Sequence, residues 1–205
     1  MPALAEAGPR TPVKSLLEIR QEGVIMQHWD LSCGAAALAT VLKYHFGEDT
    51  DERTVAQGLV QRDIYLDDPE ILQKQHGFSL LDLKQYVDRI GYRGAGYGGL
   101  ELAHLEDMAP LIVPIRVLGY NHYVVFNGRH GDRVSFADPA FGQRTMSRQA
   151  FERAWLSLPG IGRVGFTIKR NGETADHGPA RAPLKMVPRP DDRIVRQAML
   201  FRLFK

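Results

Sequence analysis

Apolar residues in the first half of the chain recur at helical spacing. From Gly34 to Phe46 they fall three or four positions apart, which lines one face of a helix, and Gly47 suits its end. Weaker patterns of the same kind predict further helices over 52–61, 69–75 and 79–90. In the last of these, Ser79 is a good N-cap residue and Asp82 occupies the third helical position. The first half is therefore expected to be mainly helical.

After Gly91 the pattern changes to short runs rich in β-branched and aromatic residues, which are typical of strands. Strands are predicted over 111–117, 123–127, 133–137 and 165–169. Asn127-Gly128 and Gly131-Asp132 are the predicted turn residues of an antiparallel pair, and Gly96 to Gly99 is interpreted as another turn. A short helix is expected over 149–156. Helices followed by antiparallel strands predict an α+β fold.

The length of 205 residues suits one domain with a tail at each end. Prolines and small polar residues predict an extended arm over 1–15, and the periodic stretch 16–170 is expected to form the domain. Over 171–205 the pattern loosens, and a short basic amphipathic helix is predicted near its end. Such a helix suits the surface of the domain itself, and contact with a membrane or partner is the less favoured interpretation.

Composition and charge exclude several functions. The 26 basic and 24 acidic residues leave a formal net charge of +2, so no strong single-sign field suggests nucleic acid as a partner. No run of apolar residues approaches the roughly 18 that a membrane-spanning helix needs. The histidines lack the close His, Cys, Asp and Glu spacing of a zinc site, so we expect no metal and no cofactor.

Two features bear on the cellular compartment. The single cysteine excludes an intramolecular disulfide and fits an oxidising or a reducing compartment equally well. Ala-Leu-Ala and Ala-Glu-Ala near the start have the small-residue pattern of a signal-peptide cleavage site, although no apolar stretch precedes them. They are consistent with the cut end of an exported precursor to which a starting Met was added.

Cys33 directly precedes the most regular predicted helix, in the segment VIMQHWDLSCGAAAL. One interpretation is a small buried side chain, because free cysteine is often part of a core, with Ala35 to Ala37 as a packing surface. The other is a nucleophile, because the free N–H groups and dipole of a helix N-terminus favour a negative sulfur. Asp30 and Ser32 are natural cap residues and favour a helix that begins here.

Two later residues are the partners that a nucleophilic thiol needs. His122 opens a β-branched and aromatic run, where a rigidly held and reachable imidazole suits a general base. Asp138 ends the next predicted strand, from which its carboxylate would reach the far nitrogen of His122. Taken alone, these two residues are a core-edge histidine and an Asp-Pro turn. Together with Cys33 they favour the catalytic interpretation.

Three further residues are candidates for the same site. Gln27 lies six positions before Cys33, and its side-chain amide is a candidate oxyanion donor together with the Cys33 backbone N–H. The alternative is an ordinary loop glutamine. Trp29 and Tyr120 neighbour the candidate catalytic residues in the sequence, and they either line a substrate groove or pack the helix onto the sheet.

Three segments together resemble the C39 peptidases, which are papain-like cysteine proteases: Gln27 to Ala35, Asn121 to Val125, and Ala137 to Pro139. The resemblance extends from about residue 24 to residue 166. It implies a papain-like α+β fold, in which a helical N-terminal half packs the nucleophile helix on a C-terminal antiparallel sheet. It also implies a role for each of four residues: nucleophile for Cys33, base for His122, orienting partner for Asp138 and oxyanion donor for Gln27.

Many C39 peptidases are domains of bacteriocin-exporting transporters and cut leader peptides after a double glycine. The chain is more similar to free-standing, exported C39-like proteins of Gram-negative bacteria, including one associated with functional-amyloid secretion. This implies a periplasmic peptidase, with the cytoplasm as the alternative, that cuts a secreted or exported protein after a double-glycine-like site. Its partner would be a substrate of a secretion or amyloid-export system. Two other functions stay open: a binding or chaperone module that cuts nothing, and an acyl transferase that passes the thioester to an amine.

Overall fold

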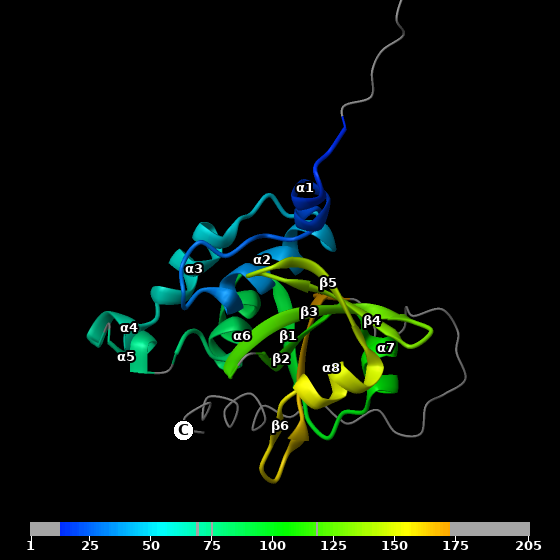
Figure 1. Cartoon of the computed structure of the whole chain (residues 1–205). Helices are drawn as coiled ribbons and strands as arrows, with labels where there is room; N and C mark the ends of the chain where they lie inside the picture. Colours follow the sequence, from blue (N-terminus) through cyan, green and yellow to red (C-terminus); the bar gives the residue numbers. More distant parts are fainter. Residues whose placement is uncertain (1–12, 69, 75, 118, 173–205) are drawn as a thin grey trace, which may run out of the picture.

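In the described part of the chain, helices pack on both faces of an antiparallel sheet (Figure 1). The computed structural model describes residues 13–68, 70–74, 76–117 and 119–172. Along these residues the helices are α1 (Leu16–Gln21), α2 (Cys33–Tyr44), α3 (Glu52–Val60), α4 (Asp63–Asp67), α5 (Ile71–Lys74), α6 (Leu80–Arg89), α7 (Leu102–Met108) and α8 (Arg148–Ala154). The strands are β1 (Tyr92–Tyr97), β2 (Leu111–Val117), β3 (Tyr120–His130), β4 (Arg133–Asp138), β5 (Gly142–Ser147), β6 (Ser157–Leu158), β7 (Gly162–Arg163) and β8 (Gly165–Arg170).

The sheet is antiparallel throughout the described part of the chain. Six strands follow the order β1-β8-β2-β3-β4-β5, and β6 pairs with β7 apart from them. The long strand β3 lies between β2 and β4, with Ile115 opposite His122 and Val125 opposite Ala137. The predicted α+β class, with helices before an antiparallel sheet, is thereby confirmed.

Apolar cores form on both faces of this sheet. On one face, α2, α3 and α6 bury their apolar sides against strand residues that include Ile112, Val125 and Phe166. On the other, α7 and α8 pack on the alternate residues of β2, β3 and β4, including Val113, Val124 and Phe136. Because side chains alternate along a strand, β2, β3 and β4 each contribute residues to both cores. Near-continuous apolar runs, rather than an alternating pattern, are the sequence signature of such a sheet.

Helix α2 is the central helix of the first core. Every residue from Cys33 to Leu42 is buried, and Ala35, Ala36 and Ala37 are fully enclosed. Side chains this small let the helix approach the sheet closely. Thr40 also accepts a hydrogen bond from the backbone N–H of Ile25 at 3.0 Å, which ties the preceding extended segment to the helix. A rigid, buried helix therefore carries the only cysteine of the sequence.

The start of α6 forms as its sequence predicts. The Ser79 hydroxyl accepts from the backbone N–H of Asp82 at 3.2 Å, and the Asp82 carboxylate accepts from the backbone N–H of Ser79 at 2.7 Å. This reciprocal capping box satisfies two N–H groups that the helix leaves unpaired. Asp82 is fully buried and also accepts from the Tyr65 hydroxyl at 2.5 Å. Through Tyr65, which lies on α4, the capping residue Asp82 also holds the segment between α3 and α6 in place.

Two edge regions of the sheet differ from the prediction. β1 was not predicted as a strand, and Gly96, assigned to a turn, lies within it. Its glycines weaken the strand signal, but Gly94 has a packing reason, since a Cβ there would lie 2.7 Å from Phe166 and 2.8 Å from Val87. β5 is a polar edge strand paired with β4 alone, and its sequence lacks β-branched enrichment.

The hairpin between β3 and β4 also differs. Asn127-Gly128 was predicted as a turn but lies inside β3, where the pairing register shifts between Phe126 and Gly128. Gly128 has φ 147° and forms a β-bulge, after which the strand continues to His130. Gly131-Asp132 alone makes the turn, with Gly131 at φ 58°. The tip of the hairpin is therefore farther from His122 than predicted.

The predicted arm and tail lie largely outside the described residues. Residues 1–12 and 173–205, which include most of the arm and the amphipathic segment, belong to no described element. Within the described ranges, the first helix begins at Leu16 with Ser15 as its N-cap, and the last strand ends at Arg170. No helix in this part of the chain is both long and apolar enough to cross a membrane.

Candidate active site

Cys33 is the first residue of α2, one position earlier than the helix predicted from Gly34. It is 9% exposed, at the boundary between the core and the surface. Ser32 occupies the N-cap position but makes no side-chain cap, because its hydroxyl instead donates to the Trp29 carbonyl at 2.7 Å. The first N–H groups of a helix have no partner within it, so the sulfur lies at the positive end of α2.

His122 and Asp138 face each other across β3 and β4. Asp138 is the last residue of β4, which pairs with β3 in the sheet. His122 Nε2 lies 2.7 Å from Asp138 Oδ1. The His122 side chain is 14% exposed, and that of Asp138 is fully buried. The two strands thus hold the imidazole by one nitrogen, as the sequence predicts.

The far side of the imidazole faces Cys33. The side chains of Cys33 and His122 lie within hydrogen-bond reach of each other. Because Nε2 is occupied by Asp138, the nitrogen on the sulfur side is Nδ1. The helix N-terminus and the two strands therefore bring together three residues from the segment between Cys33 and Asp138 that are distant in the sequence. The Asp138 carboxylate is hydrogen-bonded to one nitrogen of the imidazole, and the Cys33 side chain lies near enough to the ring to raise its pKa.

Charge stabilises the protonated form of this histidine. Burial alone lowers the pKa of His122, but hydrogen bonds and charge interactions with Asp138 and Cys33 outweigh it and raise the pKa to about 9. For Asp138, burial raises the pKa, whereas His122, Arg144 and the backbone N–H of Ala140 together lower it below its usual range. An imidazolium between a carboxylate and a sulfur is the resulting charge state at neutral pH.

Gln27 lies on the loop that leads to Cys33. Its backbone N–H donates to the carbonyl of Pro139 at 2.8 Å, so the residue after Asp138 fixes its position. Its side-chain Nε2 donates to the Trp29 carbonyl at 3.2 Å, which leaves a second amide proton for another acceptor. Among the described residues, Gln27 Oε1 is buried without a hydrogen-bond partner. The side-chain amide is thus held beside the Trp29 carbonyl, with a second N–H left as a donor.

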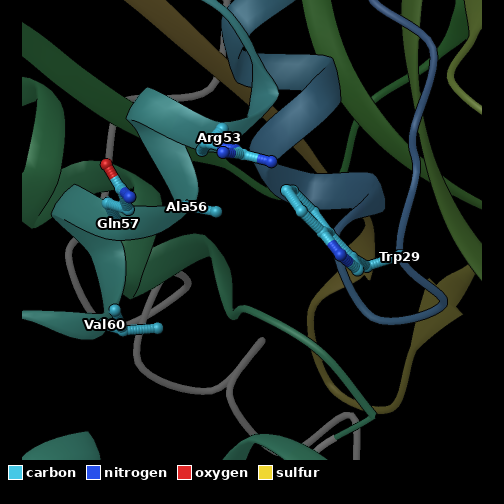
Figure 2. Close-up of a pocket in the computed structure, with 5 residues that line it drawn as sticks. All are labelled: Trp29, Arg53, Ala56, Gln57 and Val60. Atoms are coloured by element: carbon cyan, nitrogen blue, oxygen red, sulfur yellow. The ribbon is translucent and has the colours of Figure 1, made fainter.

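Trp29 and Tyr120 are both exposed, by 46% and 79% respectively. Trp29 lines a shallow, open pocket of about 380 Å³ with four residues of α3: Arg53, Ala56, Gln57 and Val60 (Figure 2). The Arg53 guanidinium carbon lies 5.9 Å from the centroid of the Trp29 ring. Tyr120 shares a face of β3 with His122, two residues away. Neither side chain belongs to the buried core between helix and sheet.

Arg144 was not predicted from the sequence. It lies on β5, and its Nη1 is 2.9 Å from Asp138 Oδ2, the carboxylate oxygen that His122 does not use. Each oxygen of Asp138 thus has a charged partner, His122 on Oδ1 and Arg144 on Oδ2, and the backbone N–H of Ala140 also donates to Oδ1 at 3.0 Å. The strand that carries Arg144 was itself not predicted, so the sequence held no signal for this contact.

The raised pKa of His122 predicts a pH dependence of stability. Since its value of about 9 lies above the 6.5 of an ordinary histidine, the contribution to stability is complete below about pH 6.5. It is lost as the pH rises from about 6.5 to about 9. We expect the Tm of the wild type to fall across this range more than that of His122→Ala. Thermal unfolding at fixed ionic strength measures both, and parallel falls in the two proteins would contradict the assignment.

No group of three or more His, Cys, Asp or Glu side chains with the geometry of a metal site occurs among the described residues. The absence of a metal therefore stays a prediction. The groups that meet at this site supply acid–base and nucleophilic chemistry without a bound ion.

Comparisons with known proteins show the family and the fold of the chain. The model of the Peptidase C39 family matches residues 21–158 of the chain. The chain therefore belongs to the peptidase C39 family, and the resemblance seen in the sequence is confirmed. The match includes all four residues that the resemblance assigns to catalysis.

Two relatives and one solved structure are similar to the chain. It is 41% identical over 147 residues to the probable functional amyloid protease FapD of Pseudomonas aeruginosa PAO1, and 36% identical over 146 residues to that of Pseudomonas fluorescens. Each alignment covers 71% of the chain but 62% of the relative. A crystal structure of a double glycine motif protease from an AMS/PCAT transporter with its leader peptide superposes with a TM-score of 0.56. It is 24% identical over 72% of this chain and 91% of that one, and it supports the papain-like fold alone.

Proposed function

We propose that the chain is a cysteine peptidase that hydrolyses a peptide bond through a thioester on Cys33. The observation that carries the proposal is the position of the His122 ring, between Asp138 at 2.7 Å and the sulfur at the start of α2. A thiol, a base and an orienting carboxylate in this order are the groups that covalent acyl transfer requires. Membership of the peptidase C39 family supports the same reaction.

In the first half of the reaction, the Cys33 sulfur attacks the carbonyl carbon of the substrate, and a C–S bond forms. The oxygen of the tetrahedral intermediate becomes negative, and it is placed to accept from the Cys33 backbone N–H and Gln27 Nε2. When the C–N bond breaks, the His122 imidazolium gives its proton to the leaving amine. Asp138 holds the ring in the correct orientation throughout.

In the second half, the neutral His122 takes a proton from water, and the resulting hydroxide attacks the thioester carbon. The C–S bond breaks, the N-terminal part of the substrate leaves as a carboxylic acid, and the thiolate and imidazolium are restored. The same intermediate would react with an amine in a transferase, and it would never form in a binding module. These two alternatives therefore differ from the peptidase in their products.

For the substrate, we propose an exported protein of a functional-amyloid system, cut after a double-glycine-like sequence in the periplasm. The names of the two Pseudomonas relatives support the amyloid connection. The double-glycine preference is proposed from membership of the C39 family, many of whose members cut leader peptides after a double glycine. Trp29 and Tyr120 are exposed, lie near the candidate catalytic residues in the sequence, and are proposed to contact the substrate chain.

Cleavage of defined peptides tests this function. The full chain is incubated under reducing conditions with two synthetic peptides that differ only in Gly-Gly or Ala-Ala before one bond, and the products are identified by mass spectrometry. We expect new termini at that bond, with the Gly-Gly peptide cut about tenfold faster or more. An added amine separates transfer from hydrolysis by the mass of the product. Binding of either peptide without any cleavage would instead support the non-hydrolytic module.

A further inference from the structure

Glu52 is a buried carboxylate beside the candidate site. It is the first residue of α3 and only 2% exposed. A charged group removed from water is costly unless it is paired or hydrogen-bonded. The groups that donate hydrogen bonds to Glu52 therefore show which segment it holds in place. Among the described residues, these groups come from the loop between Gln27 and Cys33 and not from α3 itself.

The two ends of that loop meet on this carboxylate. The backbone N–H of His28 donates to both oxygens, at 2.9 Å to Oε1 and 3.0 Å to Oε2. His28 Nδ1 lies 2.7 Å from Oε2, and the Ser32 hydroxyl contacts Oε1. His28 directly follows Gln27, and Ser32 directly precedes Cys33. One side chain thus fixes the loop immediately next to both proposed oxyanion donors.

The contacts continue from Glu52 to the side chain of Gln27. The Ser32 hydroxyl lies between Glu52 and the Trp29 carbonyl, which it reaches at 2.7 Å. The same Trp29 carbonyl accepts from the backbone N–H of Ser32 at 3.3 Å and from Gln27 Nε2 at 3.2 Å. The orientation of the Gln27 amide therefore depends on a carbonyl whose position is set by Ser32 and, through it, by Glu52.

We propose that Glu52 is a positioning residue for the oxyanion site. It holds the 28–32 loop so that Gln27 Nε2 and the Cys33 backbone N–H converge on the substrate oxygen. The inference rests on the proposed peptidase reaction, in which these two groups stabilise the tetrahedral intermediate. Misplacing such donors by a fraction of an ångström weakens stabilisation of the transition state more than binding of the substrate.

Glu52→Gln tests this role with little change of shape. The amide nitrogen of glutamine cannot accept from His28 or Ser32, so one buried donor on the loop loses its acceptor. We expect kcat for the peptide to fall about 10- to 100-fold with KM within about twofold of the wild type. Glu106→Gln is the matched control, because Glu106 pairs with Arg129 away from the loop, and we expect its kcat to be unchanged.

The rate at which iodoacetamide alkylates Cys33 distinguishes a loss of oxyanion positioning from a disturbance of the sulfur itself. This displacement needs the sulfur but forms no oxyanion, so we expect its rate in Glu52→Gln to stay within about twofold of the wild type. If Glu52→Gln lowered the alkylation rate and kcat for hydrolysis by the same factor, the proposal would be contradicted, because Glu52 would then act on the position of the sulfur. An unchanged kcat would contradict it as well.

Two further measurements keep the inference testable on its own. If Glu52→Gln does not fold, Ser32→Ala removes the hydroxyl that links Glu52 to the Trp29 carbonyl and leaves the His28 contacts of Glu52 in place. We expect about a 3- to 10-fold lower kcat, with Ser135→Ala as the control. If the wild type cuts no peptide, the proposed function fails, but the side-chain amide signals of Gln27 in ¹⁵N NMR still report its position. We expect them to move in Glu52→Gln and not in Glu106→Gln; unmoved signals would overturn the inference.

Discussion

Replacing Cys33 by alanine is expected to abolish peptide hydrolysis while leaving the fold intact. Without the sulfur no thioester forms, and the loss of a catalytic nucleophile lowers kcat by about 10⁴-fold or more. Alanine suits the position, because Cys33 is a small buried residue followed by fully enclosed alanines on the same helix. We therefore expect a stability cost of only about 1 kcal/mol. Product formation measured by mass spectrometry and thermal unfolding check the two parts of the prediction.

Val41→Ala is the control for this substitution. Val41 is buried on the same helix, two turns beyond the sulfur, and its truncation leaves a small cavity in the first core. We expect it to cost about 1–2 kcal/mol of stability and to leave kcat within about twofold of the wild type. A Cys33→Ala variant that keeps more than about 1% of the wild-type rate would show that another group is the nucleophile.

Replacing Asp138 by alanine is expected to reduce both activity and stability. It removes the partner of His122 Nε2, so the imidazole loses its fixed orientation, and kcat is expected to fall about 10³- to 10⁴-fold. The substitution also leaves His122 and Arg144 without their shared carboxylate, which we expect to cost about 2–4 kcal/mol. Steady-state kinetics and urea unfolding measure the two effects separately.

The same variant changes the titration of His122. Burial lowers the pKa of this residue, and the hydrogen bond to Asp138 is one of the interactions that outweigh it, so we expect a lower pKa in Asp138→Ala by NMR. Asp132→Ala, in the exposed turn between β3 and β4, is the matched control, with activity and the pKa of His122 unchanged. An Asp138→Ala protein with wild-type kcat would contradict the orienting role.

The parts of the fold that the sequence predicts are those with local causes. Helix α2 follows from the spacing of its apolar residues, and α6 from its capping residues, because both signals lie within a few positions of the element. Edge strands have no such signal: β1 depends on Gly94 for close packing against Phe166 and Val87, and β5 is polar. Their pairing with the rest of the sheet, rather than their own composition, makes them strands.

The residues of the candidate site also differ in how well the sequence predicts them. Cys33, His122 and Asp138 were predicted because each residue type has a chemical role and a recognisable position, at a helix start or on a strand. Arg144 and Glu52 were not, since their roles depend on which buried groups they meet. Glu52 has the sequence context of a solvated first-turn acid, which is the common case. Only the arrangement of the 28–32 loop shows that its carboxylate is enclosed and fully engaged.

The central claim is a covalent bond between substrate and Cys33, and trapping that bond tests it most directly. A peptide ester is mixed with the full chain, because esters acylate a thiol faster than the thioester hydrolyses, and the reaction is quenched with acid within the burst. Peptide mapping then locates the added mass. We predict the acyl group of the substrate on the fragment that contains Cys33, removable by hydroxylamine and absent from Cys33→Ala. Cleavage products without any adduct on that fragment, or an adduct on another residue, would contradict the account.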